Sequence, residues 1–209
     1  MSTNTPLRIG VHGASGKLGR LIMAEASESC SPLTREEYPE DLDVVIDVSS
    51  AQGTKELLSR LNGEALLVGT TGDLPWGALE DYAKQAPVAI VPNFSVGIPL
   101  LLALIDKAVQ MLPEGWDIEV MEVHHNQKKD APSGTAKRLI RALEQHRSAA
   151  IPCHALRVGD TFGEHTVWLC GPGERLELKH VATKREVFAI GAIRWAKWLV
   201  QQPNHLIRP

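Results

Sequence analysis

The sequence has few cysteines and no large excess of charge of either sign. Its three cysteines, Cys30, Cys153 and Cys170, are odd in number and far apart, which does not indicate a disulfide framework or a Cys-x-x-Cys metal site. The chain carries 22 basic and 25 acidic residues, and no segment of it is strongly basic. Nucleic-acid binding needs a clustered basic field, so we expect no nucleic-acid partner.

Long apolar runs are also missing. The most apolar stretch, residues 98–105, ends at Asp106 and is far shorter than the roughly 20 residues of a membrane-spanning helix. The first ten residues hold no apolar signal core. We therefore expect no membrane partner and a soluble, cytoplasmic protein. A composition of 44% hydrophobic and 22% charged residues is that of an ordinary globular chain.

The first half of the chain alternates short apolar runs with helical patterns. Strands are predicted over 8–11, 43–48, 65–68 and 88–91, and helices over 17–29, 53–61 and 79–85. Continuous apolar strands between helices are typical of a parallel sheet that is covered on both faces. Residues 30–41 contain Pro32, Pro39 and dense charge, and they are predicted to form a loop.

The pattern changes near residues 93–97. Residues 116–120 alternate apolar and polar side chains, as in a sheet with one face open to water. The predicted strands 166–170 and 176–182 flank Gly171-Pro172-Gly173, which is a hairpin signal. Further elements are a strand over 155–158 and helices over 100–112, 133–144 and 186–200. The second half therefore reads as helices on a mixed or antiparallel sheet, and the chain as an α/β protein.

A glycine-rich loop, residues 13–19, joins the first predicted strand to the first predicted helix. Glycines let a pyrophosphate approach the backbone, and the helix N-terminus offers it N–H groups. A glycine turn that only packs the strand against the helix is the alternative. An acidic ligand for a ribose usually follows about 20 residues later. Here Glu36, Glu37 and Arg35 fall near that distance, and the cofactor preference stays open.

Two further loops, residues 69–72 and 92–95, follow predicted strands. The carboxyl ends of parallel strands meet at one sheet edge, where ligands bind in open α/β folds. Three loops at that edge favour a ligand cleft over ordinary turns.

The densest polar segment is residues 122–136. A predicted strand delivers His124 and His125, and a helix follows Ser133. Histidine titrates near neutral pH and can act as a general acid. Lys128 and the N–H groups of residues 134–135 suit a carboxylate-bearing substrate. The two histidines are neighbours rather than four residues apart on a helix, so no metal site is predicted.

This segment, Glu-Val-His-His-x-x-Lys-x-Asp-Ala-Pro-Ser-Gly-Thr-Ala, resembles the active-site signature of the dihydrodipicolinate reductase family. The loops at 13–19, 69–72 and 93–97 and the stretch 157–166 match the family in the same order. The resemblance implies NADH- or NADPH-dependent reduction of a cyclic dicarboxylate imine in diaminopimelate and lysine biosynthesis. It also implies a homotetramer that associates through the sheet of the substrate domain.

The resemblance also implies domains and residue roles. A truncated Rossmann-type domain, residues 1–95 rejoined by 191–209, would bind the cofactor, and residues 96–190 would bind the substrate and form the tetramer. His124 would be the acid that protonates the ring after hydride transfer to C4, assisted by Lys128. The remaining substrate ligands would be His125, Ser133, Gly134 and Thr135. The cofactor ligands would be Gly13, Ser15, Gly16, Lys17, Leu18, Gly69, Thr71, Asn93 and Phe94.

The chain departs from the family pattern before the predicted strand at 43–48, where a strand–helix–strand stretch looks mostly lost. We therefore expect weak discrimination between NADH and NADPH. Two alternatives remain: a reductase of a different substrate, and a shortened NAD(P)-binding sensor. A short-chain dehydrogenase is disfavoured because neither Tyr38 nor Tyr82 has a lysine four residues later.

Overall fold

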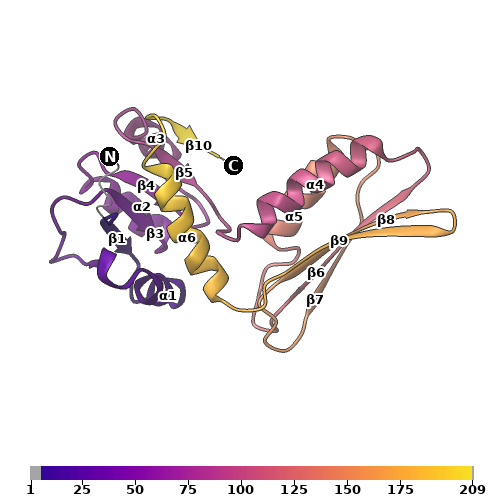
Figure 1. Ribbon diagram of the computed structural model, residues 1–209, viewed down its shortest axis with the longest axis horizontal. Coiled ribbons are helices and arrows are strands. Elements are labelled where there is room, and N and C mark those ends of the chain that lie inside the picture. The colour runs from indigo at the N-terminus through magenta and orange to yellow at the C-terminus, as the bar shows by residue number, and fades with distance from the viewer. Residues whose placement is uncertain (1–5, 209) are drawn as a thin grey trace. The chain divides into compact units, whose positions relative to one another are not determined.

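The computed structural model describes residues 6–208 and separates them into two compact units (Figure 1). The first unit contains residues up to Phe94 and those from Arg185 onward, and the second contains Ser95–Lys184. The chain therefore returns to the first unit at Arg185, earlier than the expected position 191. Among the residues described, no helix is both long and apolar enough to cross a membrane.

Sheet A, in the first unit, has six parallel strands in the order β10-β5-β4-β3-β1-β2. They are β1 (Ile9–His12), β2 (Cys30–Leu33), β3 (Val44–Asp47), β4 (Ala65–Val68), β5 (Val88–Ile90) and β10 (Leu206–Ile207). The strand order reverses at β1, because β2 lies on one side of it and β3 on the other. In open α/β sheets, ligands bind outside the carboxyl ends of the strands at such a point.

Helices cover both faces of sheet A, as the continuous apolar strands predict. The helices of this unit are α1 (Lys17–Ala26), the 3-10 turn η1 (Ser27–Ser29), α2 (Ala51–Leu58), α3 (Trp76–Tyr82) and α6 (Glu186–Leu199). Alternate strand residues such as Val11 and Ile46 pack with α1 and α6. Those on the other face, such as Val45 and Leu66, pack with α2 and α3.

The prediction of a loop over 30–41 is wrong for its first four residues, which form β2. Pro32 lies opposite Val11 in the pairing of β2 with β1. The strand is at the edge of the sheet, where proline's missing N–H costs no ladder hydrogen bond. Residues 34–43, all of them described, contain no helix, so β2 leads to β3 through a loop.

Sheet B, in the second unit, is mixed, with the order β7-β6-β8-β9. Its strands are β6 (Asp117–His124), β7 (Cys153–Arg157), β8 (Glu164–Gly171) and β9 (Glu174–Val181). The strands β6 and β7 are parallel, and the other pairs are antiparallel. The predicted hairpin is confirmed, since Gly171 pairs with Glu174 and Gly173 has a φ of +80°. Helices α4 (Gly97–Met111) and α5 (Gly134–Glu144) lie on one face of this sheet (Figure 1).

Candidate active site

A buried carboxylate, Glu122, is at the centre of the polar cluster in the second unit. It lies two residues before His124 on β6, so both side chains project from the same face of sheet B. The Glu122 side chain is 0% exposed. Arg157 on β7 donates to both carboxylate oxygens, at 2.6 and 3.0 Å. The backbone N–H of Ser133 donates to Oε1 at 3.0 Å, and Nδ1 of His124 donates to Oε2.

These donors keep Glu122 ionised despite its burial. Burial alone raises the pKa of this carboxyl group, but the hydrogen bonds from Arg157, Ser133 and His124 bring it below the ordinary value. Two-point pairing of arginine with a carboxylate is among the strongest hydrogen-bonded arrangements in proteins. The cluster therefore holds a fixed negative charge at neutral pH.

His124 presents one ring nitrogen to Glu122 and the other to a space that a glycine leaves open. Its exposed fraction is 9%. A Cβ placed on Gly163, whose φ is +148°, would lie 3.1 Å from Nε2 of His124. Burial lowers the pKa of His124, and the negative charge of Glu122 opposes that effect.

His165 on β8 supports the ring of His124 from the side. The two rings meet edge to face, with centroids 5.1 Å apart. Burial lowers the pKa of His165 to about 3, so this ring is neutral at physiological pH. Its Nε2 lies 3.2 Å from Oγ of Ser133, which also accepts a hydrogen bond from the N–H of Ala136 and caps α5. Strands β6 and β8 and the start of α5 are thus joined by polar contacts.

The remaining predicted substrate residues lie on the connection from β6 to α5. His125 follows β6 directly, and its carbonyl accepts the N–H of Lys128 at 3.1 Å. The ammonium group of Lys128 lies 2.8 Å from Oδ1 of Asp130 and lowers the pKa of that carboxyl group. Gly134 and Thr135 form the first turn of α5, where a helix favours anions. The segment therefore offers a cation and a helix N-terminus next to an acid–base side chain.

Glu122, His124 and His165 also bring three potential metal-ligand atoms within 4.8 Å of one another. Both oxygens of Glu122, however, already accept hydrogen bonds from Arg157. A cation here would also meet the charge of Arg157 at close range. The donor set fits a hydrogen-bonded histidine better than a metal centre.

The glycine-rich loop of the first unit lies so close to neighbouring backbone that side chains would clash at two of its glycines. Gly13 has a φ of +87°, and a Cβ there would lie 2.8 Å from the carbonyl oxygen of Val48. A Cβ on Gly19 would lie 2.2 Å from the carbonyl oxygen of Gly13. Helix α1 begins at Lys17 without a side-chain cap. Its first N–H groups are therefore available to phosphate oxygens.

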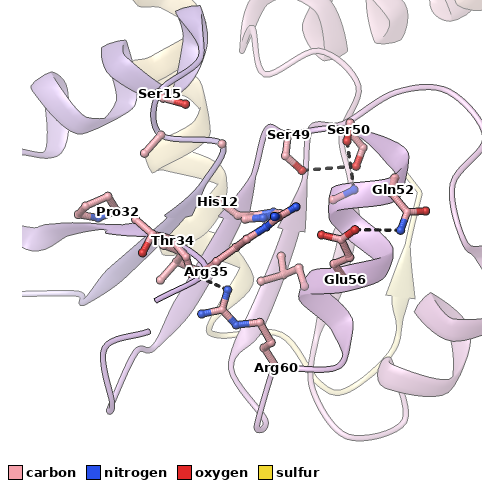
Figure 2. Close-up of a pocket in the computed structure, with 15 residues that line it drawn as sticks. His12, Ser15, Pro32, Thr34, Arg35, Ser49, Ser50, Gln52, Glu56 and Arg60 are labelled. Carbon is pink, nitrogen blue, oxygen red and sulfur yellow. Dashed lines mark hydrogen bonds between the residues drawn. The ribbon is translucent and has the colours of Figure 1, made fainter. Parts of the chain in front are cut away.

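A cavity of about 660 Å³ lies beside this loop, at the carboxyl ends of β1, β2 and β3 (Figure 2). It is lined by His12, Gly13, Ala14, Ser15, Pro32, Leu33, Thr34, Arg35, Ser49, Ser50, Gln52, Gly53, Glu56, Leu57 and Arg60. Of the predicted cofactor residues, Gly13 and Ser15 line it. Gly16, Lys17 and Leu18 lie at the start of α1 and do not.

Three cavity residues lie near the end of β2: Thr34, Arg35 and Arg60. Thr34 and Arg35 come directly after this strand, at the position where an acidic ribose ligand is common. Arg60, beyond the end of α2, donates from Nη1 to the carbonyl oxygen of Thr34 at 2.6 Å. Glu36 and Glu37, the acidic candidates of the sequence, do not line the cavity.

Asp47, at the end of β3, forms hydrogen bonds with residues at the ends of β1, β3 and β4. Its buried carboxylate accepts hydrogen bonds from Nδ1 of His12 at 3.0 Å and from Oγ of Ser49 at 2.6 Å. It also accepts from the hydroxyls of Thr54 at 2.5 Å and Thr70 at 3.1 Å. Burial raises its pKa, but the bonds from His12, Ser49 and Thr54 bring it below the ordinary value. Sequence reasoning assigned no role to this residue.

The last four cofactor candidates follow β4 and β5 at the same edge. Gly69 and Thr71 lie after β4, and Asn93 and Phe94 after β5. Phe94 is only 2% exposed and belongs to the core. A Cβ on Gly69 would lie 2.4 Å from its ring, so this phenylalanine packs directly against the loop after β4.

The fold is of the Rossmann-like α/β class, and the comparisons with known proteins place the chain among dinucleotide-dependent oxidoreductases. The sequence profile described as "Dihydrodipicolinate reductase, C-terminus" matches residues 97–208. A 4-hydroxy-tetrahydrodipicolinate reductase of Xanthomonas euvesicatoria is 38% identical over 229 residues, covering 96% of this chain and 95% of that protein. The reductase of Archaeoglobus fulgidus is 33% identical over 244 residues, covering 93% and 95%.

The chain belongs to the dihydrodipicolinate reductase family, whose members are also named 4-hydroxy-tetrahydrodipicolinate reductases. It is an NADH- or NADPH-dependent oxidoreductase of the diaminopimelate and lysine pathway. A similar fold occurs in a solved structure, "Dipicolinate bound Dihydrodipicolinate reductase from Paenisporosarcina sp. TG-14". That chain aligns with a TM-score of 0.78 at 20% identity, and the alignment covers 98% of each chain.

Proposed function

We propose that the second unit binds the cyclic dicarboxylate substrate and that His124 is its proton donor. The observation that carries this role is the hydrogen bond from Nδ1 of His124 to the buried Glu122, with Nε2 directed to the space beside Gly163. Lys128 and the first turn of α5, with His125, Ser133, Gly134 and Thr135, would bind the substrate carboxylates. The Paenisporosarcina enzyme binds dipicolinate, a ring dicarboxylate, which supports this ligand class.

The same residues account for the proton step of the reaction. When bound, NADH or NADPH supplies a hydride to C4 of the conjugated imine. The resulting enamine needs a proton at C3, and His124 donates it from Nε2. The ammonium group of Lys128 binds a substrate carboxylate beside the substrate ring and so keeps the substrate in the site. A bound dianion also favours the protonated form of His124, because opposite charges nearby raise a histidine pKa.

We propose that the first unit, residues 6–94 with 185–208, binds the cofactor. Gly13, Gly16 and Lys17 would hold its phosphates at the start of α1. The loops after β4 and β5, with Gly69, Thr71, Asn93 and Phe94, would shape the ribose and nicotinamide side. The supporting observations are the positive φ of Gly13, the uncapped start of α1 and the cavity beside the loop.

A coupled assay tests the proposed function. Pyruvate and aspartate semialdehyde are condensed by the preceding synthase, and oxidation of NADH and of NADPH is followed separately. We expect turnover that depends on the synthase product. Cofactor binding without turnover would contradict the proposal and support the alternatives, a sensor or a reductase of another substrate.

We infer that the protein prefers NADPH, because the cavity after β2 offers two arginines rather than a carboxylate. Arg35 and Arg60 line it, and its one acidic residue, Glu56, already accepts a hydrogen bond from Gln52 at 2.9 Å. Arginine is suited to a ribose 2′-phosphate. The sequence instead predicts weak discrimination, because a strand–helix–strand stretch on the adenosine side of the pocket looks mostly lost.

Arg35→Ala tests the NADPH preference. We expect the KM for NADPH to rise about tenfold, equivalent to ~1.4 kcal/mol, while the KM for NADH stays unchanged. Arg208→Ala is the matched control, because Arg208 pairs with Glu80 and does not line the cavity. Equal effects of Arg35→Ala on both cofactors would contradict a 2′-phosphate contact.

We propose that the protein is a homotetramer that associates through the face of sheet B opposite α4 and α5. Leu156, 44% exposed, lies beside Val123 in the pairing of β7 with β6, on the face away from the helices. Val181 at the end of β9 is also exposed. An open sheet face with apolar side chains is typical of an association surface.

We also propose a cytoplasmic location, supported by three unpaired cysteines.

Leu156→Lys tests this surface by placing a charge in it. Light scattering after size exclusion is expected to show a tetramer for the unchanged protein and a smaller species for the variant. Leu104→Lys on α4 is the control, because Leu104 is similarly exposed at 49% but lies on a helix. The proposal fails if the unchanged protein is a monomer, or if only Leu104→Lys dissociates it.

A further inference from the structure

Two charged residues outside the predicted site, Glu122 and Arg157, determine how His124 is presented. The Glu122 carboxylate meets Arg157, the N–H of Ser133 and Nδ1 of His124 at once. We propose that Glu122 and Arg157 act as a positioning pair that keeps one proton of His124 on Nδ1, so that only Nε2 exchanges protons with the substrate. The substrate side of this inference rests on the proposed role of His124 as acid.

The contacts of Glu122 dictate where the His124 proton resides. An ionised carboxylate can only accept hydrogen bonds, so the ring nitrogen that faces it must carry a hydrogen. Rotation of the ring by half a turn would place a carbon, Cδ2, against the carboxylate and break this bond. His165, edge to face with the ring, packs against it as well.

Arg157 fixes the carboxylate in turn. It is the β7 residue aligned with His124 in the parallel pairing of β6 and β7. Its guanidinium spans both oxygens of Glu122 and donates from Nη2 to the carbonyl oxygen of Asp130 at 2.5 Å. One side chain therefore connects β7, β6 and the loop that carries Lys128.

Nε2 of His124 is the ring nitrogen that remains for a substrate to approach, and it points toward Gly163. A Cβ on Gly163 would lie 3.1 Å from Nε2 and 3.4 Å from Cδ2 of His124. Glycine at this position leaves room for another group to approach the nitrogen. The partner of Nδ1 is fully buried, whereas the side chain of His124 itself retains an exposed fraction of 11%.

The positioning pair also sets the charge around His124. The charged and titratable groups that act on the ring are Glu122 on β6, Arg157 on β7, His165 on β8, and Lys128 in the loop after β6, where Lys128 pairs with Asp130. Of these, Glu122 opposes the lowering of the His124 pKa by burial. Because an acid must be protonated, kcat/KM is expected to fall as pH rises through this pKa. Without the charge of Glu122, the fall occurs at lower pH.

Nitrogen-15 NMR of the ring, in the unchanged protein, tests the tautomer directly. The His124 signals are assigned by their loss in His124→Gln. We expect neutral His124 to carry its hydrogen on Nδ1. A hydrogen on Nε2, or an averaged mixture of both tautomers, would overturn the inference. This readout needs no turnover, so it separates failure of the inference from failure of the proposed function.

The pH dependence of Glu122→Gln supplies the second test. We expect the descending limb of kcat/KM to move down by about one pH unit, with the substrate KM little changed. Glu114→Gln is the matched control, since Glu114 is an exposed glutamate of the same unit, in the turn before β6. A loss of active protein with an unshifted limb indicates a merely structural role and overturns the inference.

A third variant covers the case in which Glu122→Gln does not fold. Arg157→Lys keeps both charges but cannot span both oxygens of the carboxylate. We expect a lower kcat, a smaller shift of the limb than in Glu122→Gln, and partial mixing of the His124 tautomers. If Arg157→Lys leaves both kcat and the His124 tautomer unchanged, Arg157 does not position the Glu122 carboxylate.

Discussion

Replacement of His124 by asparagine is expected to lower kcat by about 10²–10⁴-fold, the usual contribution of a positioned general acid. Asparagine still offers a polar group to Glu122, so the buried carboxylate keeps a partner. The substrate KM should change little, because Lys128 and the start of α5 are untouched. Steady-state kinetics in the coupled assay, with the favoured cofactor at saturation, measures both quantities.

The control for His124→Asn is His205→Asn. His205 is an exposed histidine of the first unit, and within residues 6–208 its ring has one hydrogen bond, to the carbonyl oxygen of Pro203. We expect full activity from it. If kcat of His124→Asn falls less than about tenfold, the proton comes from another group or from water, and the proposed role of His124 is wrong.

Replacement of Gly19 by alanine is expected to weaken cofactor binding by about 100-fold, as a displacement of roughly 1 Å at a binding loop can do. The added Cβ would stand 2.2 Å from the carbonyl oxygen of Gly13 and 2.7 Å from Cα of Ala14. Both atoms belong to the backbone, so rotation of a side chain cannot relieve the clash. The glycine loop must move away from α1, and its phosphate-facing N–H groups move with it.

Fluorescence titration with NADPH measures the effect of Gly19→Ala, after a thermal melt has shown that the variant is folded. Gly77→Ala is the matched control. Gly77 lies inside α3, a Cβ there meets no atom within 4 Å, and alanine in a helix is favoured by roughly 0.5–1 kcal/mol. We expect Gly77→Ala to bind NADPH normally and to melt slightly higher. Normal binding by Gly19→Ala would contradict a phosphate site at this loop.

The elements predicted correctly from the sequence are those whose signal is local. The apolar runs at 44–47 and 65–68 form the buried strands β3 and β4, since a strand covered on both faces needs no alternation. The turn residues at 171–173 close the β8–β9 hairpin for a similarly local reason.

The elements that were missed depend on distant partners. β2 contains Pro32, which reads as a loop residue unless the strand is known to lie at a sheet edge. β10 is only two residues long and exists through its pairing with β5. Neither feature has a pattern that a window of the sequence could reveal.

The residues of the candidate site also fall into two groups: those within one local motif, and those that strand pairing brings to it. His124, Lys128 and Ser133 lie in one continuous motif and were found together. Arg157 lies 35 residues from Glu122, and only the pairing of β7 with β6 brings it there. His165 is not among the site residues that the sequence predicts, but its ring centroid lies 5.1 Å from that of His124. The one available signal was the two-residue spacing of Glu122 and His124, which places both on one strand face.

The first unit is assembled from both ends of the described chain, and this has a consequence for synthesis on the ribosome. Its core needs Ala189, Ala192 and Leu199 of α6, and Gly191 packs on the backbone of Phe94. Residues 6–94 emerge early but lack this helix and β10 until translation has passed residue 207. The second unit, Ser95–Lys184, is continuous and can fold while the ribosome is still adding α6. We therefore expect the second unit to complete its fold before the first unit, whose sheet lacks the cover of α6 until residues 186–199 are synthesised.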